Sequence, residues 1–234
     1  MQITRLSHWL RRIAMAPHRA CLAVVVMLLS MVATQTVPAQ LAPPCVENSP
    51  ERRGEIGCSV VERKLLPADL QEPLFWHIDR FDSAERARAA VGATSIAFEA
   101  SGTWWLMTIE SQTSEHHGGQ HTAAVGPLTL PLAARYSMQV QSSAHTPGMY
   151  SLVHTHSGVE GFYALEGEAC LETPTRGYKL RKGGTLAIPG GIAMRIVATG
   201  SAVRRVLGVI VHDAAQPPTM RMQEGKGPPL VACE

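Results

Sequence analysis

The sequence predicts an all-β fold, and three observations carry this prediction. Short runs of β-forming residues recur between about residue 128 and residue 213. Turn signals containing glycine or proline separate these runs. Hydrophobic residues make up 45% of the 234 residues and charged residues 17%, which is typical of a globular chain. Many short strands at close spacing indicate an antiparallel sandwich or barrel.

The first 39 residues have the parts of a secretory signal peptide. An apolar run over 21–33 follows an arginine-containing start that has no acidic residue, and Val37-Pro38-Ala39 offers a small-residue cleavage site. The run is about 13 residues long, too short to span a bilayer comfortably as a helix. We therefore expect a cleaved signal at 1–39, a periplasmic or secreted mature protein, and no stable membrane span after cleavage. An uncleaved anchor is the alternative, and Arg11-Arg12 allows a twin-arginine interpretation.

Four cysteines remain once the signal is removed, and an even number in an oxidising compartment suggests disulfides. Cys45 and Cys58 are close in sequence, with proline and glycine between them, so we favour that pair. Cys170 would then pair with Cys233. The alternative for Cys170 is a free thiol in the core, because it lies in an apolar-alternating stretch.

Residues 40–112 are expected to form a lead-in and a mixed strand and helix extension. Proline and glycine make 40–58 irregular, and Ser83 can cap a short alanine-rich helix over 83–91. The other predicted elements are strands over 75–81, 95–99 and 103–109 and a polar loop over 113–127. These residues could be extra strands on the barrel or a separate α+β unit.

The predicted barrel occupies residues 113–213, and a proline-rich tail, 214–234, is expected to run extended over the surface. The predicted strands are 136–140, 149–156, 161–165, 169–172, 185–188, 194–198 and 204–212.

The candidate chemistry lies between Gly148 and Gly167. His154 and His156 are two residues apart on a strand, so their side chains share a face. A bend at Ser157-Gly158 can bring Glu160 beside them. Two imidazoles and one carboxylate suit Fe, Mn, Ni, Zn or Cu and leave coordination positions open for a ligand.

This stretch resembles the first signature of the cupin superfamily, and it matches at every fixed position: Gly148, His154, His156, Glu160 and Gly167. A second cupin signature is matched at Gly183, Pro189 and Gly191. Its histidine is replaced by Met194 and its later asparagine by Ala198. The resemblance covers roughly residues 125–213. It implies a jelly-roll β-barrel with the metal inside, makes a homodimer plausible and a degenerate second cupin in 59–112 conceivable, and implies no particular reaction.

The replacement at Met194 leaves several outcomes open, because cupins usually place a fourth ligand there. Three ligands and waters could hold the ion, Met194 could ligate a softer ion such as copper, or the site could be empty. His212, at the end of a later strand, is a further candidate for the missing ligand.

Apolar residues predicted to face the barrel interior would form a pocket for a small molecule: Tyr150, Leu152, Phe162 and Ile196. We expect His145 to lie in a loop entering the motif strand and Arg204-Arg205 to be a solvated strand end.

The leading functional prediction is an exported cupin that binds a divalent metal ion and a small-molecule ligand. A metal-dependent dioxygenase or isomerase and a metal-free barrel that binds other proteins are the alternatives. The formal net charge is +2, and much of the excess sits in the predicted signal, so no basic face argues for nucleic acid.

Overall fold

The computed structural model describes residues 39–47, 56–70, 73–112 and 118–234. The predicted signal peptide therefore lies outside the described residues, apart from Ala39. None of the helices in the described ranges has the length and apolar character needed to cross a membrane.

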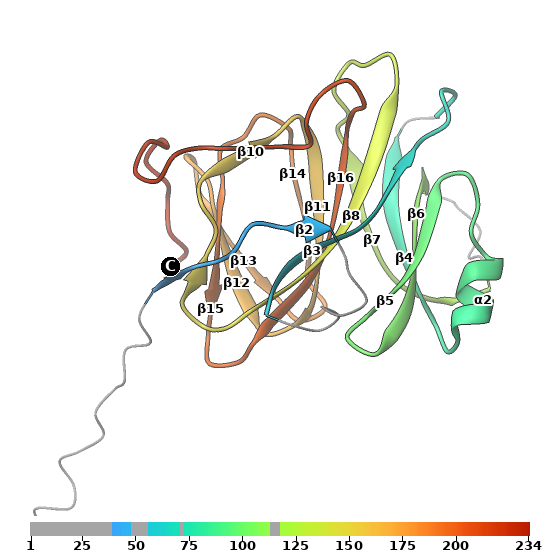
Figure 1. The fold of residues 1–234 in the computed structure, drawn as a ribbon, viewed down its shortest axis with the longest axis horizontal. Helices are drawn as coiled ribbons and strands as arrows, with labels where there is room; N and C mark the ends of the chain where they lie inside the picture. The colour runs from blue at the N-terminus through green and yellow to red at the C-terminus, as the bar shows by residue number, and fades with distance from the viewer. Residues whose placement is uncertain (1–38, 48–55, 71–72, 113–117) are drawn as a thin grey trace, which may run out of the picture. The chain divides into compact units, whose positions relative to one another are not determined.

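One wall of the barrel is a six-stranded sheet. Its order is β14 (Thr185–Ile188), β11 (Gly158–Glu166), β16 (Arg204–Asp213), β8 (Tyr136–His145), β3 (Gly57–Leu65) and β2 (Val46–Glu47). The neighbouring strands pair antiparallel except for β2 with β3, and Figure 1 shows β11, β16 and β8 side by side. The lead-in thus supplies β3, which extends the sheet that carries the motif strand β11.

The opposite wall is a five-stranded sheet and a two-stranded ribbon. The sheet order is β1 (Gln40–Leu41), β9 (Met149–Tyr150), β15 (Arg195–Thr199), β12 (Glu168–Glu172) and β13 (Gly177–Arg181), and the ribbon joins β10 (His154–His156) to β17 (Thr219–Arg221). Gly167 makes the turn from β11 to β12 with a φ of +67°, and a Cβ there would lie 2.6 Å from the carbonyl oxygen of Val203. The motif glycine is therefore required by both conformation and space.

The central strands of the six-stranded sheet, β11 and β16, bury side chains on both faces. Alternate residues such as Phe162 and Val206 face the barrel interior and pack with Leu171 of the opposite wall. The residues between them, such as Tyr163 and Val209, belong to a second core on the outer face. Burial on both faces explains why β11 and β16 are nearly continuous apolar runs in the sequence.

The second core is completed by a four-stranded sheet from the extension. Its order is β5 (Ser95–Ala100), β6 (Thr103–Ser111), β4 (Leu74–Phe81) and β7 (Gln120–Leu128). Trp76 of β4 and Val125 of β7 pack in this core, and a Cβ on Gly161 of β11 would lie 3.0 Å from the Trp76 ring. This part of the extension therefore packs against the outer face of the barrel.

The helix and most strands of the extension lie where the sequence predicted them. The helix α2 (Ala84–Ala89) begins after Ser83, whose hydroxyl accepts a hydrogen bond from the Arg86 amide. Residues 113–117 of the predicted loop 113–127 lie outside the described residues, and the prediction is wrong from residue 120, where β7 begins. β7 is an edge strand with mostly exposed side chains, so its polar residues resemble a loop in the sequence.

The disulfide favoured from the sequence, Cys45–Cys58, and the less favoured pair, Cys170–Cys233, are both present. Cys45 is bonded to Cys58, and Cys170 is bonded to Cys233. Cys170 is therefore not a free core thiol. The first bond ties the segment before β2 to β3, and the second ties the end of the tail to β12.

Candidate metal centre and cavity

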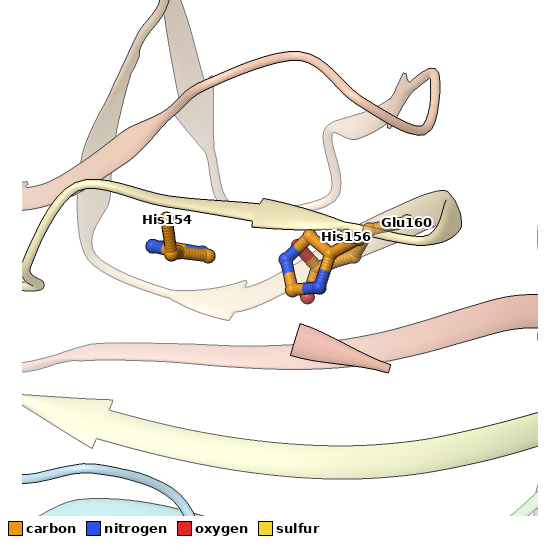
Figure 2. Close-up of side chains that lie close together, drawn as sticks. All are labelled: His154, His156 and Glu160. Carbon is orange, nitrogen blue, oxygen red and sulfur yellow. The ribbon is translucent and has the colours of Figure 1, made fainter. Parts of the chain in front are cut away.

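The three candidate ligands lie together inside the barrel. His154 and His156 project from the same side of β10, and Glu160 follows on β11 after the bend at Ser157 (Figure 2). One ligand atom from each residue lies within 4.8 Å of the others. The exposed fractions of the three residues are 8%, 3% and 1%. The structure therefore brings together the two imidazoles and the carboxylate of the sequence motif.

Backbone carbonyls fix the orientation of both imidazoles. Nδ1 of His154 lies 2.8 Å from the carbonyl oxygen of Leu152, and Nδ1 of His156 lies 3.0 Å from that of Pro218. A carbonyl oxygen only accepts hydrogen bonds, so both Nδ1 atoms donate. Each Nε2 atom then carries a lone pair, which is the arrangement found behind metal-ligating histidines.

Two buried atoms of the cluster lack an aligned hydrogen bond. Nε2 of His156 and Oε2 of Glu160 lie 2.8 Å apart, yet neither has a hydrogen-bond partner among the described residues. The other carboxylate oxygen, Oε1, accepts from the side-chain amide of Gln141. Two buried acceptor atoms that face each other at this distance need a positive charge, which either a proton on Nε2 of His156 or a metal ion beside both atoms supplies. The donor set and its geometry therefore fit a divalent metal ion.

The electrostatics of the two histidines differ. Burial lowers the pKa of His154, and the neighbouring His156 lowers it further. Burial also acts to lower the pKa of His156, but the Glu160 carboxylate and the Pro218 carbonyl outweigh it and raise the pKa above its ordinary value. The cluster thus favours positive charge at Nε2 of His156, where a metal ion would bind.

Met194 occupies the position opposite His154. The backbones of the two residues exchange hydrogen bonds of 2.8 and 3.0 Å, and directly opposed residues share a face. The Met194 side chain is 1% exposed and packs in the apolar cluster with Phe162 and Ile188. The structure therefore places Met194 beside His154 in the strand pairing, with its side chain in an apolar environment.

His212 lies on β16 outside the cluster. It is opposite Gly158 in the sheet, and its Nδ1 lies 2.8 Å from the carbonyl oxygen of Asp213. It is not among the grouped ligand atoms of the described residues.

A cavity of about 330 Å³ opens beside the three ligands. Leu152, Phe162 and Ile196 line it, as expected for three of the four predicted pocket residues. Tyr150 lines a separate cavity, where its ring lies 5.8 Å from the Arg195 guanidinium. Residues 151–153 are not in a strand, so the two-residue alternation counted back from His154 does not continue to Tyr150.

Sequence analysis missed the polar side of this cavity. Arg204 is not a solvated strand end: it is 1% exposed and lines the cavity, whereas Arg205 is half-buried beside Glu166. His145 is the last residue of β8 and not part of a loop. The residues that share its face also line the cavity: Gln139, Gln141 and Ser143. The polar and apolar alternation around Met138 and Val140 was the signal that could have revealed this face.

The two ends of the described chain complete the cavity. Residues 41–45 line it from the lead-in, and Pro218, Thr219 and Arg221 line it from the tail. The expected surface tail is thus partly a strand, because β17 pairs with β10 and places Thr219 opposite His156. The tail also supplies the Pro218 carbonyl that orients His156.

Comparisons with known proteins find similarities of low score to solved structures. No family model matches the chain, and no curated protein matches it. A cupin-like protein from Thermotoga maritima is 19% identical over 36% of this chain and 64% of its own, with a TM-score of 0.34. A variant of oxalate decarboxylase from Bacillus subtilis is 20% identical over 36% of this chain and 24% of its own, with a TM-score of 0.32. Salicylate 1,2-dioxygenase from Pseudoaminobacter salicylatoxidans is 15% identical over 31% and 19%, with a TM-score of 0.29.

These similarities carry no argument about activity. The barrel walls define an all-β protein, as the sequence predicted, and the chain carries the complete Gly148–Gly167 motif by which it resembles the cupin superfamily. What the domain binds has to be argued from its own residues.

Proposed function

We propose that this chain is an exported cupin that holds one divalent metal ion through His154, His156 and Glu160 and binds a small molecule in the adjoining cavity. One observation carries the proposal: the ligand atoms lie within 4.8 Å of one another, and each imidazole is held by a carbonyl at Nδ1 so that Nε2 is free to coordinate. In this proposal Met194 lies beside the ion without coordinating it, so the protein supplies three ligands. Fe, Mn, Ni, Zn and Cu all suit this donor set.

Metal analysis of the protein purified without chelators tests the proposal. We expect about one equivalent of metal per chain, and we expect His154→Ala and His156→Ala each to abolish its retention. His121→Gln is the matched control, because His121 lies on β7 in the four-stranded sheet and is not a cavity residue. Unchanged metal content in both alanine variants would refute the site. A melting temperature that EDTA does not change would favour the metal-free alternative, since bound metal stabilises the folded state by mass action.

A metal-dependent enzyme is the second candidate. Three protein ligands leave open coordination positions, and a metal bound there would supply Lewis-acid or redox chemistry to the small molecule. Oxygen uptake or isomerisation with a substrate panel, lost in His156→Ala, tests this candidate. An inert Zn site with no turnover would argue against it.

Export is part of the same proposal. The signal-like residues 1–39 and the two disulfides, Cys45–Cys58 and Cys170–Cys233, support an oxidising compartment such as the periplasm. Detection of a mature chain that begins near residue 40 in the exported fraction would test it. The homodimer stays a prediction.

A further inference from the structure

A buried arginine in the cavity wall forms no ion pair with the carboxylates that the structure describes. Arg204 is 1% exposed and projects from the inward face of β16. Its Nη2 donates to the hydroxyl of Ser143 at 3.1 Å and contacts Nδ1 of His145 at 2.6 Å. No ion pair joins it to an acidic residue of the described ranges, unlike Arg205, which pairs with Glu166. A buried guanidinium without a counter-ion is costly unless something else neutralises it.

The protonation of this pair follows from its contacts. A guanidinium has only donors, so Nδ1 of His145 accepts and its proton sits on Nε2. Burial, reinforced by the Arg204 charge, lowers the pKa of His145 to about 3, so the ring stays neutral near pH 7. Burial lowers the pKa of Arg204 to about 10, with Glu160 acting in the opposite direction, so the guanidinium stays charged. The pair therefore presents one positive charge and no negative one.

Two donors of the pair are left over. Nε of Arg204 and Nε2 of His145 are both buried and have no hydrogen-bond partner among the described residues. With the proton assignment above, both atoms carry an N–H group. Both atoms are buried, and the residues that carry them line the cavity. Unsatisfied donors on a guanidinium that forms no ion pair among the described residues match an anionic acceptor.

The rest of the cavity agrees with an anion. Among the described residues, the charged side chains that line the cavity are Arg63, Arg204 and Arg221 and one carboxylate, Glu160. Arg63 is already bonded to Glu47 and Gln139. A metal ion held by the histidines and Glu160 would add further positive charge to the same space.

We propose that Arg204 and His145 form a subsite for the carboxylate of a small organic acid, whose apolar part lies against Phe162, Ile196 and Val206. A planar guanidinium matches a carboxylate, and these apolar walls suit an organic group. The subsite deepens the proposed function by naming the class of its small molecule, but its own atoms do not depend on the metal. It lies on the side of the cavity formed by β8 and β16.

Benzoate and benzamide test the subsite, because the two probes share a ring and differ in charge. Ligand-observed NMR titrations would be run on the protein as purified and again after EDTA treatment. We expect benzoate to bind in both states and benzamide to bind at least about tenfold more weakly. We expect Arg204→Met to weaken benzoate by about tenfold or more, while Arg205→Gln, on the opposite face of β16, leaves it unchanged.

A second variant covers the case in which Arg204→Met does not fold. His145→Phe removes the Nε2 donor and the acceptor for Arg204 while keeping a ring, and we expect it to weaken benzoate severalfold but not benzamide. Equal binding of the two probes would overturn the proposal. Tighter binding of inorganic phosphate than of benzoate would also overturn it. So would benzoate binding that requires the metal and is unchanged in both Arg204→Met and His145→Phe. Failure of the metal proposal would be seen separately, as absence of metal in the untreated protein.

Discussion

The neutral state of buried His145 makes a quantitative prediction about stability and pH. The pKa of this histidine is about 3 in the folded chain against 6.5 in the unfolded chain, because burial and the Arg204 charge oppose protonation. A folded pKa below the unfolded one means that the unfolded state binds more protons as the solution is acidified. The stabilising contribution is therefore present above pH 6.5 and is lost as the pH falls towards 3.

The magnitude follows from the two pKa values. Between pH 7.5 and pH 4.5, His145 alone should remove about 2.6 kcal/mol of folding free energy, from linkage at 1.36 kcal/mol per pKa unit. Urea unfolding followed by tryptophan fluorescence measures the loss in the native chain and in His145→Gln. EDTA in every sample removes any contribution of metal binding.

The comparison between the native chain and His145→Gln isolates the contribution of His145 to the pH dependence of stability. The substitution will change stability at both pH values, but the change between pH 7.5 and pH 4.5 should be about 2.6 kcal/mol smaller in His145→Gln, because glutamine does not titrate. The same pH dependence in both proteins would mean that His145 is charged or exposed in the folded state. That result would also remove the donor assignment at Nε2 on which the carboxylate subsite depends.

Three further predictions concern the metal site and the tail. Met194→His should tighten metal binding at least about tenfold if three protein ligands hold the ion in the native chain. Competition with a chelator of known affinity measures this change. An unchanged affinity would show that a side chain at position 194 does not reach the ion. Removing the tail after β16 takes away the Pro218 carbonyl behind His156 and should weaken metal binding by about 10- to 100-fold, whereas an unchanged affinity would show that this contact is dispensable. Replacing both Cys170 and Cys233 with alanine removes a cross-link between residues 63 positions apart. Denaturant titrations should show an unfolding free energy lower by about 4 kcal/mol. A loss near zero would contradict the idea that this bond stabilises the fold.

The motif could be predicted from sequence because it depends on short-range geometry. A spacing of two residues fixes the common face of His154 and His156, and the bend at Ser157, just before Gly158, is needed for Glu160 to join them. Gly158 itself leaves no room for a side chain, since a Cβ there would lie 1.9 Å from the carbonyl oxygen of Val211. Short spacings of this kind can be interpreted from the sequence without knowledge of which strands are neighbours.

The polar side of the cavity depends on long-range pairing and could not be predicted in the same way. Arg204 is buried because β16 pairs with β8 and places it opposite His145, 59 residues away in the sequence. An arginine at a strand end is usually solvated, so the local pattern favoured the wrong environment. Thr219 lies opposite His156 for a similar reason, because β17 pairs with β10, and no local periodicity in the sequence predicts that pairing.

The walls formed by residues 41–45 and by β17 have a practical consequence for handling the protein. Each belongs to a segment outside the large sheets, and each segment carries one of the two disulfides. A purification tag fused close to either segment would sit beside the cavity opening, and production in a reducing cytoplasm would leave both segments untethered. Preparations made in those two ways should be compared with exported, untagged protein before a missing metal or ligand is attributed to the sequence.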